Sequence, residues 1–323
     1  MPRTLLVAIA LCLSLTMPPV LAQSGEYPNR PIKLVVTYPP GASFDIISRI
    51  LAEKWTQLLG QPVVVENRLG AGGMIAMQSV ARSTADGYTL VTFNTDLAGI
   101  VPALYQFKAY DPLKDFAYVG TLMRGSGFIV AVNPKLPVRS MEELAKYAKA
   151  SLKGVNYGSY GVGSLPHLGF EALNAKLGTN MVHVPYKGGM PSYQAAMVGE
   201  IEVVAGTSFI DLLKSGQLRP LAIGGKKRSP QFPDIPTLPE LGLGEDMFGA
   251  TYLGVAAPAG TPQHIIDRLS AELRKVSQMP DVIERVGKFA EVSYAPPDEL
   301  AGMVKRDVNF YAPLVKSLGL SNQ

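Results

Sequence analysis

The hydrophobic pattern of residues 31–60 predicts a buried strand followed by an amphipathic helix. Ile32–Tyr38 is an apolar run, and Pro39-Pro40-Gly41 ends it. Ser43 is then a candidate helix N-cap with Asp45 in the first turn, and apolar residues recur at helical spacing as far as Gly60. This stretch therefore reads as a strand that feeds a helix through a short glycine loop.

Such a loop has a chemical consequence. It directs several backbone N–H groups at one point beyond the strand, and the helix dipole adds partial positive charge there, so the point suits an anion such as a carboxylate. Any α/β unit has the same pattern, however, and a fold does not fix a function. Both interpretations stay open at this stage.

The next segments continue the same alternation. Pro62–Val65 and Tyr88–Phe93 are two further apolar runs with a helical stretch between them. The order β-α-β-α-β predicts a parallel sheet with helices on both faces. Ligands bind such sheets at the carboxyl ends of the strands. The loops Pro39–Ser43, Asn67–Gly73 and Asn94–Asp96 are expected to meet there.

The second half repeats this architecture without repeating its sequence. A Gly/Ser loop, Gly158–Ser164, precedes the expected helix Leu165–Leu177, and Tyr186–Gly189 precedes another. Thr261 is expected to cap a later helix with Pro262 in its first position. The C-terminal helices, from Pro297 onward, are expected to return and cover the first domain.

The N-terminal residues have the pattern of a secretory signal. In Met1–Ala22, Arg3 supplies the positive charge and Leu5–Leu15 an apolar stretch too short to span a bilayer, which predicts cleavage after Ala22. The only cysteine, Cys12, lies inside this stretch. Export without disulfides indicates a bacterial periplasm. The roughly 300 remaining residues predict two domains.

Charge and motifs exclude several classes of function. The formal charge of +4 becomes +3 without Arg3, and the triplet Lys226-Lys227-Arg228 has no interleaved aromatic residues, so nucleic-acid binding is not expected. The pattern G-x-S-x-G, metal-ligand spacing, the dinucleotide fingerprint and the P-loop are all absent from the sequence. His167 is interpreted as a ligand contact, as a polar support for the loop before it, or as a general base. Many N–H and hydroxyl donors with few titratable groups indicate a binding protein without metal or cofactor.

The loops resemble those of one known family, the substrate-binding proteins of tripartite tricarboxylate transporters, also called Bug proteins. The similarity extends over essentially the whole chain after the predicted cleavage at Ala22. The motifs that carry it are Tyr27–Ile32, Pro40–Asp45, Val65–Gly73, Asp86–Leu90, Tyr110–Phe116, Gly163–Leu168, Val184–Gly189 and Pro233–Glu240.

This resemblance implies an α/β, two-domain type II periplasmic-binding-protein fold, or Venus flytrap, with a ligand cleft between the domains. The first domain is expected to comprise residues 23–125 and 226–323, and the second residues 126–225. Family members hold a ligand carboxylate largely through backbone N–H groups, hydroxyls and waters. The positions that correspond here are Gly41, Ala42, Ser43, Phe44, Asp45 and Thr95 in the first domain, and Ser159, Gly161, Gly163, Ser164, His167, Tyr186, Gly188 and Thr207 in the second.

The sequence departs from the family pattern at two positions of the first loop. Ala42 replaces the second residue of a Gly-Gly pair, and Phe44 replaces a small residue. Phe44 either offers an aromatic face to the ligand or packs near the hinge. Asp45 either favours the helix dipole, anchors the loop, or accepts a hydrogen bond from the ligand.

The hypothesis that follows is a periplasmic solute-binding protein without catalytic residues. It is expected to be a monomer, to capture a small di-, tri- or aromatic carboxylate, and to deliver it to the membrane permease subunits of a transporter. Two alternatives stay open: a ligand-sensing receptor for a signalling partner, and an enzyme of similar fold, which would need a titratable pair in the cleft.

Overall fold

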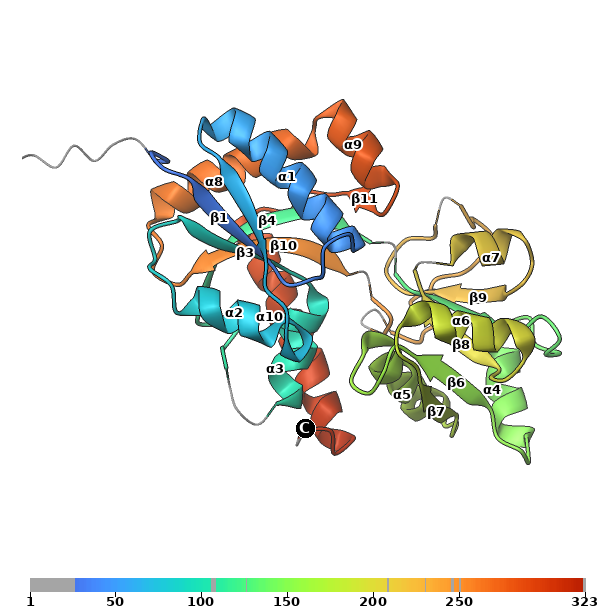
Figure 1. Ribbon diagram of the computed structural model, residues 1–323. Coiled ribbons are helices and arrows are strands. Elements are labelled where there is room, and N and C mark those ends of the chain that lie inside the picture. Colours follow the sequence, from blue (N-terminus) through green and yellow to red (C-terminus); the bar gives the residue numbers. More distant parts are fainter. Residues whose placement is uncertain are drawn as a thin grey trace, which may run out of the picture.

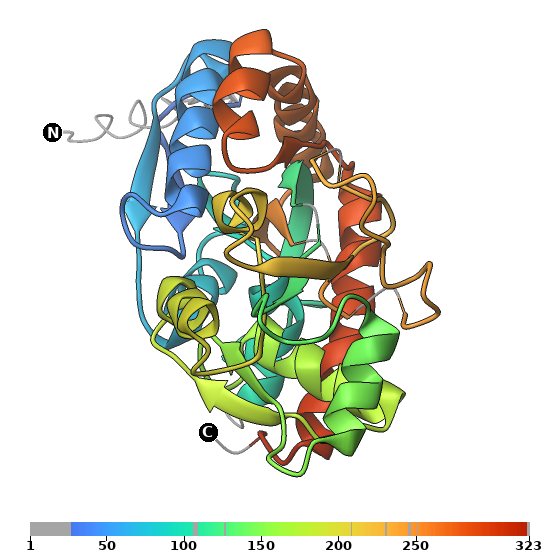
Figure 2. The ribbon, with the colours of Figure 1, turned by 90° about the vertical axis from the view of Figure 1, so that its right-hand side faces the viewer.

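The computed structural model describes residues 27–105, 109–125, 127–207, 209–229, 231–244, 247–249 and 251–321. The predicted signal sequence, with Cys12, lies outside them. Two β-sheets, each flanked by helices, form two lobes (Figures 1 and 2). We call the lobe with the six-stranded sheet the first lobe and the lobe with the five-stranded sheet the second lobe.

The six-stranded sheet of the first lobe has the order β11-β4-β10-β3-β1-β2. Its strands are β1 (Ile32–Val36), β2 (Val63–Asn67), β3 (Thr89–Phe93), β4 (Phe116–Arg124), β10 (Tyr252–Pro258) and β11 (Glu291–Val292). The strands β1, β2 and β3 are parallel, as expected, whereas β10 and β4 join the sheet antiparallel. The expectation of a parallel sheet therefore holds only for its first three strands.

Helices cover both faces of this sheet (Figure 1), because the side chains of β1 alternate. Ile32 and Leu34 pack into one buried cluster with residues of α1, α8 and α9, while Val35 packs into another with residues of α2, η2 and α10. The helices of this lobe are α1 (Ser43–Leu59), η1 (Ala71–Gly73), α2 (Met74–Ala81), η2 (Asp96–Ile100), α3 (Val101–Leu104), α8 (Gln263–Ser277), α9 (Pro280–Gly287) and α10 (Pro297–Ser317).

The five-stranded sheet of the second lobe has the order β7-β6-β8-β5-β9. Its strands are β5 (Ile129–Val132), β6 (Asn156–Ser159), β7 (Val182–Pro185), β8 (Val203–Gly206) and β9 (Arg219–Ile223), and its helices are α4 (Met141–Ala150), α5 (Leu165–Leu177), α6 (Gly189–Val198) and α7 (Ile210–Lys214). The strands β6, β7 and β8 are parallel, and β5 is antiparallel to both of its neighbours.

Two crossing segments join the lobes, one between β4 and β5 and one between β9 and β10. Their backbones touch: the Phe128 N–H donates to the Phe248 carbonyl (2.9 Å), and the Gly224 N–H donates to the Phe128 carbonyl (2.8 Å). A Cβ at Gly127 would lie 1.9 Å from the Gly224 carbonyl oxygen, so only glycine fits there. We propose that the domain boundaries lie in these segments, because residues 126–225 supply every strand of the second sheet.

The helix α10 covers the first lobe, as expected, and also reaches the second. Its residues Met303 and Val304 belong to a buried cluster of the first lobe, whereas Tyr311 and Val315 pack with residues of β5 and α5. No helix among the described residues is long and apolar enough to cross a membrane.

Two predicted helix caps are wrong. Ala42, not Ser43, is the N-cap of α1, and no side chain caps that helix. Pro262, not Thr261, is the N-cap of α8, because the Thr261 hydroxyl donates to the Pro258 carbonyl at 2.8 Å and thus closes the preceding turn.

Candidate functional site

The loop between β1 and α1 is held by one buried carboxylate. Asp45, only 1% exposed, accepts hydrogen bonds from the Gly41 N–H (2.9 Å), Arg49 Nε (3.0 Å) and Asn67 Nδ2 (2.6 Å). Burial alone would raise the pKa of this carboxyl, but these hydrogen bonds outweigh it and hold the pKa below its usual value. Of the roles left open for Asp45, this geometry favours the loop anchor.

The donors that this loop offers differ from those expected. The Gly41 N–H is bonded to Asp45, and the Ala42 N–H donates to the Pro39 carbonyl at 3.1 Å. The N–H groups of the first helical turn, from Ser43 to Asp45, have no acceptor within the helix. No side chain of the described residues caps them. This uncapped turn lies at the end of α1 nearer to the second lobe (Figure 1) and retains the partial positive charge of a helix N-terminus.

Phe44 packs against the protein on this side. Its ring stacks on Tyr38, with the ring centroids 4.7 Å apart and the planes at 15°. The Tyr38 hydroxyl in turn accepts from Asn94 Nδ2 at 2.7 Å, and the same amide nitrogen donates to Asp96 Oδ2 at 3.1 Å. Burial raises the pKa of Asp96 despite that hydrogen bond. Stacked rings and hydrogen bonds therefore connect Phe44 at the start of α1 to Asn94 and Asp96 after β3.

In the second lobe, the loop after β6 is tied to two histidines. Ser159 Oγ lies 2.6 Å from His183 Nε2 and accepts from the Gly161 N–H at 3.0 Å. The Gly163 N–H donates to His167 Nδ1 at 3.0 Å, and the His167 and His183 rings stack with centroids 3.9 Å apart. His167 is 7% exposed, so the structure favours its role as a polar support of the loop.

The hydroxyl of Ser164 also serves this loop, since it donates to the Gly161 carbonyl at 2.7 Å. Ser164 is the N-cap of α5, yet its side chain does not bond an N–H group of that helix. The first turn of α5 is thus uncapped in the same way as the first turn of α1.

Tyr160 contacts several of the second-lobe residues that adjoin the candidate positions. Its hydroxyl contacts the Tyr193 hydroxyl and donates to the Ala205 carbonyl at 3.3 Å. Gly189, next to the candidate Gly188, and Gly206, next to the candidate Thr207, both approach these rings. The Tyr186 N–H donates to the Ser159 carbonyl at 3.1 Å, which ties the loop before α6 to β6.

The two sides come close to each other at Tyr160 and Asp96. Burial raises the pKa of the Tyr160 hydroxyl, and the neighbouring Tyr193 and the Asp96 carboxylate of the first lobe add to that rise. A Cβ at Gly163 would lie 2.6 Å from the Leu104 side chain of the first lobe. The structure thus places the loop after β6 near η2 and α3 of the first lobe.

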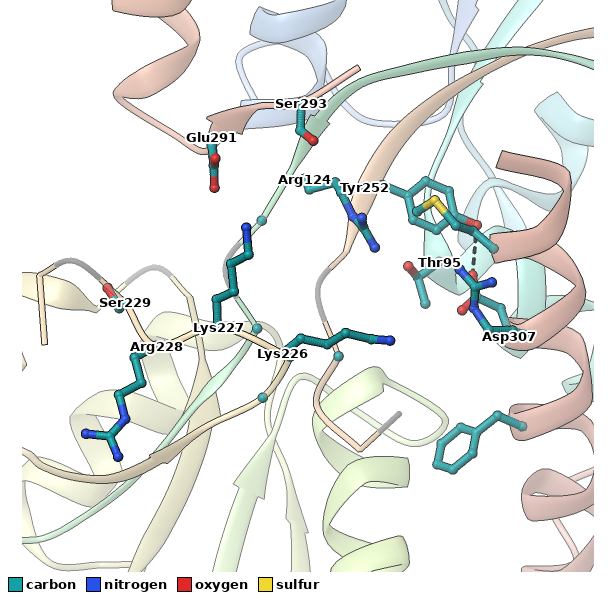
Figure 3. Close-up of a pocket in the computed structure, with 18 of the residues that line it drawn as sticks. Thr95, Arg124, Lys226, Lys227, Arg228, Ser229, Tyr252, Glu291, Ser293 and Asp307 are labelled. Carbon is teal, nitrogen blue, oxygen red and sulfur yellow. Dashed lines mark hydrogen bonds between the residues drawn. The ribbon is translucent and has the colours of Figure 1, made fainter. Parts of the chain in front are cut away.

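Thr95 is the remaining candidate. It precedes η2, and its side chain lines a cavity beside α10 and the crossing segments (Figure 3).

Tyr38, Asn94, Asp96 and Tyr160 were missed as candidates. Each lies in or beside a loop that the sequence pattern had marked, and that position was the available signal. These residues come together through contacts between segments that are far apart in the sequence, which local pattern does not reveal.

The arrangement offers hydrogen-bond donors and little acid–base chemistry. Ser159 and His183 form a serine–histidine pair, but Ser159 is 0% exposed and its hydroxyl also bonds within its own loop, so it is not placed as a nucleophile. Burial lowers the pKa of both histidines, in the case of His183 to about 4, so both are neutral at pH 7. Within the described part of the chain, no group of acids and histidines could hold a metal ion.

Two α/β lobes, two crossing segments and facing loops at the carboxyl ends of parallel strands define the class of periplasmic binding proteins. A family model described as the tripartite tricarboxylate transporter family receptor matches residues 47–320. The chain belongs to this family of periplasmic solute-binding receptors, which includes the Bug proteins.

Individual relatives agree with this assignment. The chain is 36% identical to the UPF0065 protein in the gbd 5′ region of Cupriavidus necator, with 99% of this chain and 97% of the relative aligned. It is 32% identical to protein BugT of Bordetella pertussis, over 92% and 91% of the two chains.

Among solved structures, R. palustris Rpa4515 with adipate has a TM-score of 0.74 at 29% identity, covering 91% of this chain and 98% of that one. MatC (Rpa3494) from Rhodopseudomonas palustris with bound malate has a TM-score of 0.72 at 28% identity, covering 90% and 100%.

Proposed function

We propose that this protein captures a small organic carboxylate between its two lobes and delivers it to the membrane permease of a tripartite tricarboxylate-type transporter. The observation that carries the proposal is the uncapped first turn of α1, held in place by the buried Asp45 anchor. N–H groups fixed at a helix N-terminus bind a carboxylate without a counter-charge. The adipate and malate in the structures of similar proteins support this class of ligand.

The ligand would contact residues of both lobes. In the first lobe these are Ser43 and Phe44, with Gly41, Ala42 and Asp45 shaping the loop. In the second lobe, Tyr160 and the loop after β6 supply hydroxyl and N–H groups, while Tyr186, Gly188 and Thr207 border them. Closure of the lobes then traps the ligand and creates the surface that the permease recognises.

The remaining parts of the proposal concern the compartment and the partners. Export to the periplasm with cleavage after Ala22 is supported by the sequence pattern of Met1–Ala22 and by the family. We propose a monomer without catalytic activity, because the serine–histidine pair is committed to loop structure. A signalling receptor in place of the permease is the alternative, and no feature of the fold favours it.

A ligand screen tests the proposal. Adipate, malate, citrate, benzoate and glutamate are each added to the protein, and the melting temperature is measured by thermal shift. Ligand at a hundred times its dissociation constant adds about 2.7 kcal/mol of stability. We expect at least one acid to raise the melting temperature, with the binding confirmed by calorimetric titration.

The matched control is the amide of the same acid, for example adipamide for adipate. We expect no shift from the amide, because it lacks the charge that the helix N-terminus selects. Equal shifts from acid and amide, or no shift from any acid, would contradict the proposal.

A further inference from the structure

A cavity of about 320 Å³ lies where α10 meets the crossing segments (Figure 3). Its lining includes Arg124 at the end of β4, Lys227 in the segment after β9, and Arg306 on α10. Neither the loop before α1 nor the loop after β6 contributes to it. In Figure 2, α10 and the segment after β9 lie on the opposite side of the molecule from the loop before α1. We call this space the hinge cavity.

Positive charge predominates around the hinge cavity. Five lining residues are basic and two, Glu291 and Asp307, are acidic. Arg228 is set aside because its guanidinium pairs with Glu240 at 2.9 Å, and Figure 3 shows it turned away. The Asp307 carboxylate accepts from the Tyr252 hydroxyl at 2.8 Å. The Arg124 guanidinium lies 3.9 Å from the exposed Glu299 carboxylate, a long surface pair that contributes little. The side chains of Arg124 and Lys226 extend into the space from different segments (Figure 3). Such a concentration of like charge in a concave site favours an anion.

A buried hydroxyl without a partner lies in the wall of the same space (Figure 3). Thr95 is 4% exposed, and its Oγ1 has no hydrogen-bond partner among the described residues. Buried polar groups are nearly always paired, so an unpaired one requires an explanation. A bound ligand with an acceptor atom would supply the missing partner, since a hydroxyl can donate one hydrogen bond.

We propose that the hinge cavity binds a small oxyanion, either inorganic phosphate or a small dicarboxylate. The Thr95 hydroxyl donates to the anion, and Arg124, Lys227 and Arg306 balance its charge. The volume is within the range of small-molecule sites. Phosphate and carboxylate share the chemistry that these groups recognise.

The position of the site has a consequence that rests on the proposed function. Arg124 belongs to the first lobe and Lys227 to a crossing segment, so an anion between them is sensitive to the angle between the lobes. Binding in the hinge cavity and binding between the facing loops are then coupled, and the coupling is reciprocal. Occupancy of the hinge cavity would change the affinity for the transported carboxylate.

The experiment compares anion binding to the parent protein and to three variants. Inorganic phosphate and succinate are titrated calorimetrically at constant ionic strength, set with sodium chloride. The variants are Thr95→Val, Arg306→Met and the control Lys305→Met. The control removes the same charge from the neighbouring position of α10, which does not line the cavity.

We expect phosphate or succinate to bind the parent and the control alike. Thr95→Val and Arg306→Met should each weaken the affinity by about tenfold, as expected for a lost hydrogen bond to a charged group. Thr95→Val should not lower the melting temperature of the empty protein, because it removes an unpaired hydroxyl. A merely structural threonine would lower that temperature and leave the affinity unchanged.

Three results would overturn the proposal: no binding of either anion, equal weakening by Lys305→Met, or full affinity in both Thr95→Val and Arg306→Met. Asp45→Ala distinguishes the two sites. A carboxylate that responds to Asp45→Ala and not to Thr95→Val binds between the facing loops. An anion with the reverse response binds in the hinge cavity, whatever the outcome for the transported ligand.

Discussion

Replacing Asp45 by alanine removes the one acceptor that three donors of the first lobe share. The bonds from Gly41 and Asn67 go to a buried carboxylate and contribute about 1.5 kcal/mol each. The Arg49 side chain is 48% exposed, so its ion pair adds only about 0.5 kcal/mol. The expected loss is therefore about 3.5 kcal/mol, which lowers the melting temperature by about 7–14 °C.

The assay is thermal unfolding of the empty protein across pH, followed by calorimetric titration with the best ligand of the screen. The native pKa of Asp45 is lowered, so its stabilisation is fully present above the pKa of an unfolded aspartate, near 3.8. This stabilisation is lost as the pH falls through the lower native value. The difference between parent and Asp45→Ala should thus be constant from pH 7 to 5 and shrink below pH 4.

Asp234→Ala is the matched control, because Asp234 is exposed and its carboxylate has no hydrogen bond or ion pair in the described part of the chain. We expect the control to melt within about 1 °C of the parent. An Asp45→Ala protein that melts as the parent does, or a difference that stays constant to pH 3, would refute the role of Asp45 as the loop anchor.

Three further changes test neighbouring parts of the structure. Ser164→Ala should cost the empty protein about 1 kcal/mol, because its hydroxyl donates to the Gly161 carbonyl, and should leave the carboxylate affinity nearly unchanged, because that hydroxyl has no second proton to donate; a tenfold loss of affinity in titration would contradict this. Burial holds the native pKa of His183 near 4, below its unfolded value, so the free energy of unfolding should fall as the pH decreases from 6.5 towards 4. Denaturant unfolding of His183→Gln should show a weaker dependence of this free energy on pH, and an unchanged dependence would contradict the prediction. Gly127→Ala should destabilise the protein by about 1–3 kcal/mol because its Cβ meets a carbonyl oxygen at 1.9 Å, whereas Gly125→Ala, with its nearest neighbour at 3.4 Å, should melt close to the parent.

Local pattern predicted the elements that carry the loops. The apolar run of β1, the helical spacing of α1 and the glycine at its end are all properties of neighbouring residues, so sequence reasoning located them. The strand β4 was missed because Gly120 and Thr121 interrupt its apolar run. The antiparallel direction of β10 arises because the chain returns from the second lobe before this strand, and the local sequence pattern carries no information about that return.

The candidate site was predictable only in part, for the same reason. The loop before α1 was identified, but the role of Asp45 depends on Asn67, which lies 22 residues away. The electrostatic effect of Asp96 on Tyr160 links residues of two different lobes. The hinge cavity combines Thr95, Arg124 and Arg306, and no spacing in the sequence relates these three positions.

A crystal structure of the protein grown with the acid that gives the largest thermal shift tests the central claim most directly. We predict the carboxylate at the uncapped first turn of α1, bonded to the N–H groups of Ser43 and Phe44, with Tyr160 and the loop after β6 facing it across the gap between the lobes. A carboxylate found in the hinge cavity alone, or on the outer surface of either lobe, would contradict the assignment of the transport site to the facing loops.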